Sequence, residues 1–188
     1  MIKQARKIGL LMVIGLSVMA LYRGVMSDSI ESIGTLEVSS DSFADGQRLP
    51  IDFTCEGKNI SPHIAWGGVP AGVKSFALIC DDPDAPSKNF VHWVIYDMPA
   101  DLFELAVGIP TAQILENGAR QGVNGFGRIG YGGACPPRGH GVHRYFFTVY
   151  ALDRLLGLQP GVRRAELDAA MCGHIVAKGC IIGCYSRS

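Results

Sequence analysis

Three long runs of β-branched and aromatic residues constrain the fold of this chain more than any other feature. They are VKSFALICDD at residues 73–82, FVHWVIYDMP at 90–99 and RYFFTVYALD at 144–153. Each run has the length of a strand and is bounded by turn-forming residues, so each predicts a buried strand. The composition agrees, because 24 glycines and only 18% charged residues favour a turn-rich β protein over a helical one.

The segments near the C-terminus add two further elements. RRAELDAAMCGHI at 163–175 has helical spacing and is stopped by Gly173, which predicts one main helix. VAKGCIIGCYS at 176–186 predicts a closing strand. The expected fold class is therefore mainly β, a β-rich α+β architecture, in a single domain over residues 28–188.

The remaining segments have less regular patterns. Residues 35–53 are consistent with two short strands joined at Asp45-Gly46, and ADLFELAV at 100–107 with one or two helical turns. Residues 108–133 are rich in Gly and predict a long irregular loop. Such loops are uncommon without a function, so this one is a candidate surface for a protein partner.

The first 27 residues have the pattern of an export signal. MIKQARK carries three positive charges and no acid, and the 14 residues at 8–21 are apolar and uncharged. Because a helix needs about 20 apolar residues to cross a bilayer, we expect a cleaved signal peptide. An uncleaved anchor through residues 8–21 stays open. The mature protein is expected to be exported, either periplasmic or secreted.

Charge and cysteine content limit the function further. The formal net charge is zero, which argues against nucleic acid as the main partner. All six cysteines follow the predicted signal, and in an oxidising compartment they permit up to three disulfides whose pairing the count leaves open. Cys180 and Cys184 fall on one face of an expected strand, too far apart to share an ion or a bond. No metal site is assigned to the cysteines.

Four polar side chains lie at predicted strand ends beside Gly- and Pro-rich loops. They are Asp82, His92, His143 and Tyr145, and the loops are DDPDAP at 81–86 and GGACPP at 132–137. Where such ends converge, small-molecule sites form, and two imidazoles with a phenol and loop N–H groups suit a tetrahedral anion such as a phosphate head group. The alternative is structural: His92 is a satisfied core histidine, and His143 and Tyr145 satisfy each other.

Asp81, Asp82 and Asp84 place three carboxylates within four positions. At least one is expected to serve as an ordinary turn residue that bonds its own backbone. Three neighbouring carboxylates repel one another, and a nearby cation or a protonated histidine would relieve the repulsion. In particular, Asp82 could orient an imidazole and hold it protonated.

The motifs DDPDAP, HW at the opening of a strand and YGGACPPRGHGVHRYFFTVYALD together resemble the phosphatidylethanolamine-binding protein family, in its bacterial, Raf kinase inhibitor-like branch. The resemblance runs from Leu36 to Arg187. It implies a large antiparallel sheet packed against a smaller sheet, with an anion-binding cavity at one edge. The ligand-binding residues that it implies are Asp82, Asp84, Pro86, His92, Gly133, Pro137, His143 and Tyr145.

The same resemblance implies a disulfide between Cys55 and Cys135, whose loops the family fold brings toward the cavity. This chain departs from the family in two respects. The C-terminal helix that mammalian members place over the cavity has no counterpart before Ser188, so a more open site is expected. Ala134 stands where bacterial members often have Pro.

The leading functional hypothesis is an exported binding protein that holds a small anionic or phosphorylated ligand, without catalysis, cofactor or metal. One alternative is a protease or kinase inhibitor that acts through surface loops such as 108–133. Another is a metal-assisted phosphoester hydrolase using Asp82, His92 and His143. Nucleic acid is not an expected partner, and membrane contact is expected only through the N-terminal segment if it is uncleaved.

Overall fold

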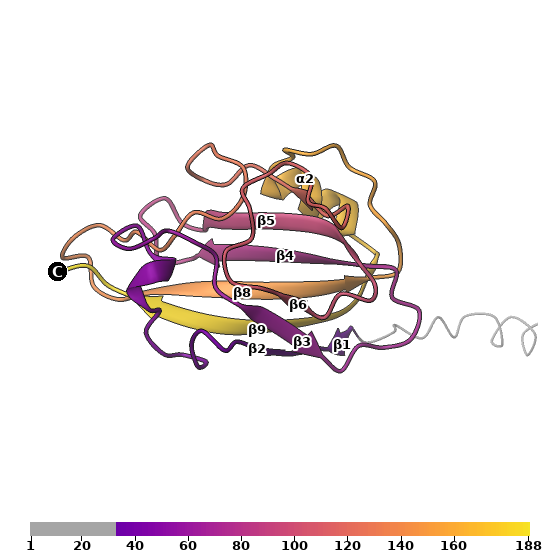
Figure 1. Cartoon of the computed structure of the whole chain (residues 1–188), viewed down its shortest axis with the longest axis horizontal. Coiled ribbons are helices and arrows are strands. Elements are labelled where there is room, and N and C mark those ends of the chain that lie inside the picture. Colours follow the sequence, from indigo (N-terminus) through magenta and orange to yellow (C-terminus); the bar gives the residue numbers. More distant parts are fainter. Residues whose placement is uncertain (1–32) are drawn as a thin grey trace, which may run out of the picture. The chain divides into compact units, whose positions relative to one another are not determined.

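The computed structural model describes residues 33–188, drawn in colour in Figure 1. The predicted signal peptide or anchor therefore lies outside the described residues. Within residues 33–188, no helix is both long and apolar enough to span a membrane.

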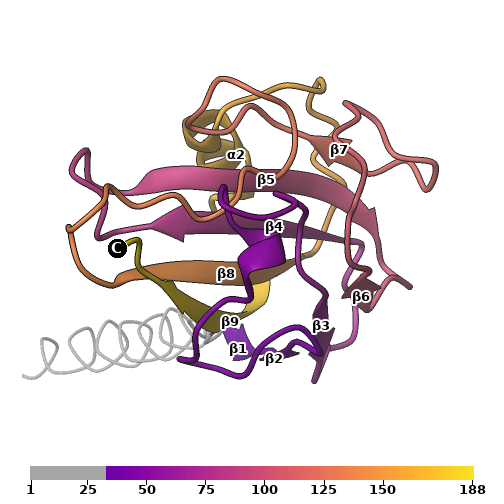
Figure 2. The same cartoon turned by 60° about the vertical axis from the view of Figure 1, so that its left-hand side comes forward.

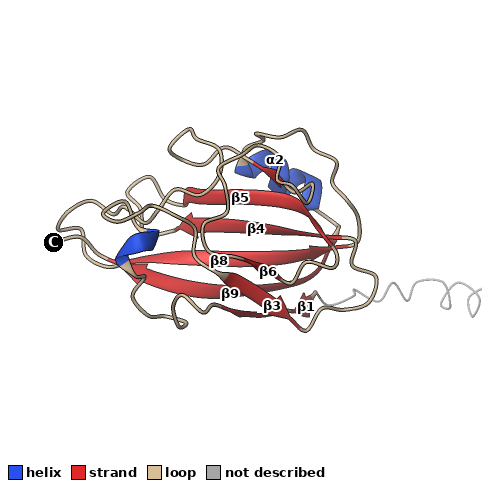
Figure 3. Ribbon diagram, in the orientation of Figure 1, coloured by secondary structure: helices blue, strands red, loops and turns tan. Residues whose placement is uncertain are grey.

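Among the described residues, six strands form a large sheet in the order β1-β9-β8-β4-β5-β7, and Figure 3 shows that strands outweigh helices in the regular structure. All neighbouring pairs are antiparallel except β1 and β9, which are parallel, so the sheet is mixed rather than wholly antiparallel. The strands in sequence order are β1 (Gly34–Thr35), β4 (Ser75–Asp82), β5 (Phe90–Pro99), β7 (Arg120–Gln121), β8 (His143–Leu152) and β9 (Ile175–Tyr185).

A smaller sheet packs on one face of the large sheet, and the helix α2 (Arg164–Met171) packs on the other. In this part of the chain the small sheet has the order β2-β3-β6. Figure 2 shows α2 behind the large sheet, alongside β5. The strands of the small sheet are β2 (Glu37–Ser39), β3 (Ile64–Gly67) and β6 (Glu104–Leu105).

The alternation of side chains along β4 explains the two layers. Phe76 and Leu78 enter the core between the sheets, whereas Ala77 and Ile79 contact the cluster that includes Leu167 of α2. Both faces of β4 are therefore buried, which accounts for its continuous apolar sequence. The three central strands β4, β5 and β8 lie at or within two residues of the predicted runs.

Two local predictions were wrong. Residues 100–107 contain β6 instead of helical turns, because Leu105 is buried and pairs with Ile64 of the small sheet. Within 35–53 the second strand is absent from the described structure: Arg48 forms only an isolated bridge to β9, and the segment ends in the 3-10 helix η1 (Ile51–Phe53). In both cases long-range pairing decides the local structure.

The long loop at 108–133 is irregular, as predicted, and the buried amide of Gln121 helps to hold it in place. Gln121 Nε2 donates to the carbonyls of Pro110 and Ala112 at 2.7 Å each, and Gln121 Oε1 accepts from Trp93 Nε1 at 2.7 Å. This anchoring holds the loop against β5, through the short strand β7.

The sheet topology brings three strand ends together. Because β4 runs antiparallel to both β5 and β8, its last residue, Asp82, lies beside Phe90 at the start of β5 and near His143 at the start of β8. In Figure 1 this is the end of the sheet near the C-terminus.

Candidate functional site

A cavity of about 300 Å³ opens at this end of the large sheet. Phe90 and Phe126 form an apolar side of the cavity. Five of the residues implied by the family resemblance line it: Asp82, Pro86, His92, Pro137 and His143. The strand ends thus converge on a shared hollow that combines aromatic walls with a carboxylate and two imidazoles.

Asp82 and His143 form a buried pair in the cavity wall. His143 Nδ1 lies 2.6 Å from Asp82 Oδ2, and the two side chains are 2% and 3% exposed. The carboxylate is an acceptor, so the proton is assigned to Nδ1. The other oxygen of Asp82 accepts the backbone N–H of Asp84 at 2.8 Å, which is the turn contact expected of an Asp at a strand end.

Each of the three neighbouring carboxylates is paired with a different basic side chain, and these pairs offset the repulsion between the carboxylates. The pairs are Asp81 with Arg164, Asp82 with His143, and Asp84 with Arg144.

Asp84 faces away from the cavity and forms a two-pronged ion pair. Nε and Nη2 of Arg144 each donate to the carboxylate of Asp84 at 2.9 Å, and the backbone N–H of Arg144 donates at 3.0 Å. These hydrogen bonds lower the pKa of Asp84 to about 2. Asp84 does not line the cavity, and its role here is to join the turn after β4 to the start of β8.

His92 is enclosed by aromatic rings. The ring centroids of Phe90, Phe126 and Tyr145 lie 5.1, 5.5 and 5.0 Å from that of the imidazole. His92 Nδ1 donates to the carbonyl oxygen of Gly132 at 2.6 Å. Burial lowers the pKa of His92, so the neutral form is favoured and Nε2 carries a lone pair.

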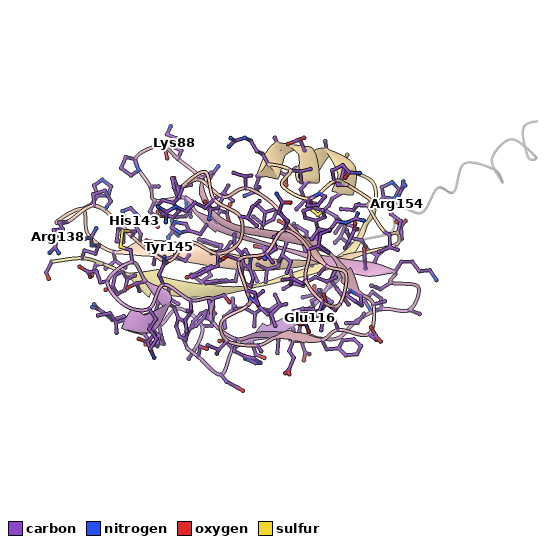
Figure 4. All side chains as sticks on the ribbon, turned by 45° about the horizontal axis from the view of Figure 1, so that its top comes forward. Lys88, Glu116, Arg138, His143, Tyr145 and Arg154 are labelled. Carbon is purple, nitrogen blue, oxygen red and sulfur yellow. A yellow bond between two sulfur atoms is a disulfide. The ribbon has the colours of Figure 1, made fainter. Side chains whose placement is uncertain are left out.

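Tyr145 lies behind His92 and is not among the cavity-lining residues. Its side chain is buried, and its hydroxyl has no hydrogen-bond partner within residues 33–188. Burial raises the pKa of Tyr145, so the phenol stays protonated. Figure 4 labels His143 and Tyr145 at the same end of the molecule.

His140 is a third imidazole that the sequence reasoning missed. Its Nδ1 lies 2.7 Å from Nε2 of His143, so a chain of hydrogen bonds runs from His140 through His143 to Asp82. With Nδ1–H of His143 committed to Asp82, a neutral His143 accepts at Nε2 from His140. The only sequence signal was the spacing of three between the two histidines.

The loop amides expected to bind a ligand are engaged within the chain. Gly132 N–H donates to the backbone carbonyl of His92 at 2.8 Å, and Gly133 N–H donates to Asn59 Oδ1 at 2.6 Å. Gly133 lines a neighbouring cavity of about 480 Å³ rather than the one at His143. A side chain at position 133 would collide, because a Cβ there would lie 2.6 Å from Asn59 Oδ1 and 2.8 Å from the backbone of Thr54.

The structure confirms the disulfide between Cys55 and Cys135. The two Cα atoms are 5.4 Å apart, and the bond joins positions 80 residues apart in sequence. Cys135 lines the cavity at His143, and Cys55 lines the neighbouring cavity. The disulfide therefore fixes loops that border both hollows.

No group of three or more His, Cys, Asp and Glu side chains within residues 33–188 is arranged to hold a metal ion.

Comparison with known proteins identifies relatives over most of the described chain. The model of the phosphatidylethanolamine-binding protein family matches residues 39–186. A protein of Aquifex aeolicus named UPF0098 protein is 54% identical over 153 residues, which cover 81% of this chain and 89% of the relative.

Two solved structures are similar in fold and sequence. One is described as a putative phosphatidylethanolamine-binding protein homologue from Chlamydia trachomatis; it is 37% identical with a TM-score of 0.74, and the match covers 82% of this chain and 99% of that one. The other, YbcL of E. coli, is 34% identical with a TM-score of 0.74 and coverages of 82% and 100%. With a matching family model, a shared fold and these relatives, the chain belongs to the phosphatidylethanolamine-binding protein family, in its bacterial branch.

Proposed function

We propose that this protein binds a small anionic group of the phosphate type in the cavity at His143 and does not transform it. The observation that carries the proposal is the buried pair of Asp82 and His143, 2.6 Å apart, in a cavity that His92 also lines. A carboxylate on one imidazole nitrogen stabilises a proton on the other, and an imidazolium N–H is a strong donor to an anion.

The proposal specifies how the protonation of His92 and His143 is linked to ligand binding. In their neutral forms His92 and His143 present lone pairs at Nε2, because each Nδ1–H is already donated within the chain. An anion needs donors, so its binding is coupled to proton uptake by these rings. His143 Nε2 must also exchange its contact with His140 for the ligand.

Two observations favour binding over chemistry. Cys135 is in a disulfide, so its sulfur is not available as a thiolate nucleophile. Ser87 lines the cavity, but within the described residues its hydroxyl has no hydrogen bond to a base. Nothing in the structure specifically favours phosphoester hydrolysis or protease and kinase inhibition, which stay predictions.

Two further observations support the class of the ligand and the cellular location of the protein. The Chlamydia trachomatis protein is described as a putative homologue of phosphatidylethanolamine-binding protein, and its similarity supports a phosphate-bearing ligand such as a phospholipid head group. The disulfide is consistent with an oxidising compartment, which supports a periplasmic or secreted protein.

The test is a titration of the purified protein with phosphate and with glycerophosphoethanolamine, followed by NMR of the imidazole nitrogens. The proposal predicts saturable shifts of the His92 and His143 signals. His174 is the internal control, because it pairs with Asp153 and lines neither cavity. Shifts that are equal at all three rings, or absent from His92 and His143, would refute the proposal.

A further inference from the structure

A second cavity of about 480 Å³ lies beside the first and has a different chemical character. The two cavities share Phe126, a residue that is 44% exposed. They also border the two sides of one peptide group: His92 donates to the carbonyl of Gly132, and the N–H of Gly133 donates to Asn59. Phe126 therefore lies at the boundary between the two cavities.

The second cavity presents hydrogen-bond donors and no carboxylate. Arg128 lines it, and within residues 33–188 its hydrogen bonds are made by its backbone N–H and C=O, which leaves the guanidinium without a partner. Asn59 Oδ1 is occupied by Gly133 N–H, which leaves the amide Nδ2 as a donor. The hydroxyl of Thr111 also has no partner in the described chain, and no Asp or Glu is among the lining residues.

The first cavity differs from the second in the charge and the hydrogen-bonding groups that it offers to an anion. There Asp82 contributes a carboxylate, and the imidazoles become donors only after protonation. A guanidinium group forms hydrogen bonds to phosphate or carboxylate oxygens in a planar, two-pronged geometry and needs no added proton to do so. The second cavity is thus suited to an anion without proton uptake.

We propose that the second cavity is a subsite for an additional acidic group of the same ligand. The ligand class is then a molecule with two anionic groups on a short spacer, one at His143 and one at Arg128, with the spacer crossing Phe126. This inference rests on the proposed function of the first cavity and adds to it the identity of the ligand's second group.

The experiment compares bisphosphates with matched monophosphates. The probes are propane-1,3-diyl and hexane-1,6-diyl bisphosphate, with propyl and hexyl phosphate as references, measured by calorimetry and by NMR of histidine and arginine side chains. Two variants remove the second subsite. Arg128→Gln removes the charge, and Asn59→Asp keeps the acceptor for Gly133 N–H while it replaces the amide donor with a negative charge.

Arg154→Gln is the matched control. Arg154 is also an exposed arginine, it contacts the carbonyl of Leu155 and the ring of His174, and it lines neither cavity. Figure 4 labels it at the opposite end of the molecule from His143. The control reproduces the loss of one positive charge from the whole protein without touching the subsite.

We expect at least one bisphosphate to bind about tenfold more tightly than its monophosphate reference, because the second group binds at high effective concentration. Arg128→Gln and Asn59→Asp should remove this advantage, and Arg154→Gln should keep it. The inference is overturned if neither bisphosphate gains over its reference, or if both variants keep the gain.

The NMR signals separate this inference from the proposed function. Shifts of His92 and His143 with every probe, without any response of Arg128, retain the first cavity and overturn the second. A response of Arg128 without any response of the two histidines retains the second cavity as an anion site and overturns the proposed function of the first.

Discussion

Asp82 and His143, 61 residues apart in sequence, are joined by a buried hydrogen bond of 2.6 Å at the rim of the large sheet. The bond links the end of β4 to the start of β8, and it leaves Nε2 as the imidazole nitrogen that does not contact Asp82. The other oxygen of Asp82 holds the turn that follows. One carboxylate thus shapes the turn and orients the proposed anion donor.

Asp82→Asn should weaken phosphate binding roughly tenfold, since a neutral amide stabilises an imidazolium much less than a carboxylate does. The measurement is calorimetric titration near neutral pH, with circular dichroism to show that the fold is retained. Asp153→Asn is the control, because Asp153 bonds His174 Nδ1 in the same way at 2.9 Å, away from the cavity. Equal affinities in the Asp82 variant and the wild type would contradict the assigned role.

His92 should make the fold less stable in mild acid. Burial lowers its pKa in the folded state, while the charges of Asp82 and Asp81 and the hydrogen bond to Gly132 oppose this effect. The neighbouring Tyr145 phenol is uncharged. The unfolded chain therefore takes up the proton first, so this contribution is complete above about pH 6.5 and declines as the pH falls toward the folded-state pKa.

The check is urea unfolding of the wild type and His92→Gln at two pH values, about 7.5 and 5.5, on either side of the ordinary histidine pKa. Glutamine stays neutral and retains a donor for the Gly132 carbonyl. Other groups titrate in both proteins, so the difference between the two pH dependences isolates His92. A wild type that loses no more stability than the variant in acid rules out this prediction.

Phe126→Ala should raise the pKa of His92 toward its ordinary value. Desolvation is the main cause of the lowered pKa, and the Phe126 ring covers the imidazole at a centroid distance of 5.5 Å. Because Phe126 is 44% exposed, the loss of stability should be only about 1–2 kcal/mol. The pKa is read from an NMR titration of the His92 ring.

Phe103→Ala is the control for this variant, since Phe103 is similarly exposed at 50% and contacts Phe76 instead of a histidine. It should leave the His92 titration unchanged. If both variants move the pKa equally, or neither does, Phe126 is not the shield of His92.

The double variant Cys55→Ser/Cys135→Ser should lose about 2–4 kcal/mol of unfolding free energy, because the disulfide closes a long loop in the unfolded chain. Both cavities should also become more mobile, since one sulfur lines each. Denaturant unfolding measures the first effect, and amide hydrogen exchange of residues 132–135 measures the second. Cys172→Ser, at an exposed free cysteine, is the matched control. A double variant as stable as this control contradicts the prediction.

The strands could be predicted from the local sequence, because burial imposes a periodic pattern of apolar residues on a strand. In β8 the residues Tyr145, Phe147 and Val149 face the core between the sheets, with His143 at the end of that stripe, as alternation requires. The disulfide between Cys55 and Cys135 followed from the family resemblance and not from the cysteine count, which left its pairing open.

The parts that could not be predicted depend on contacts between distant segments. Leu105 lies in a strand because Ile64 pairs with it, and the local sequence of residues 100–107 does not indicate this pairing. The acceptor for Gly133 N–H is Asn59, 74 residues away. His140 lies in an exposed loop without periodicity, so alternation could not show that its ring reaches His143.

The most direct test of the central claim is a crystal structure of the protein with phosphate. The account predicts a tetrahedral anion within hydrogen-bond distance of His143 Nε2, with the ring of His140 displaced from its present contact at 2.7 Å. An anion bound away from His143 and His92, with the bond between His140 and His143 intact, would contradict it.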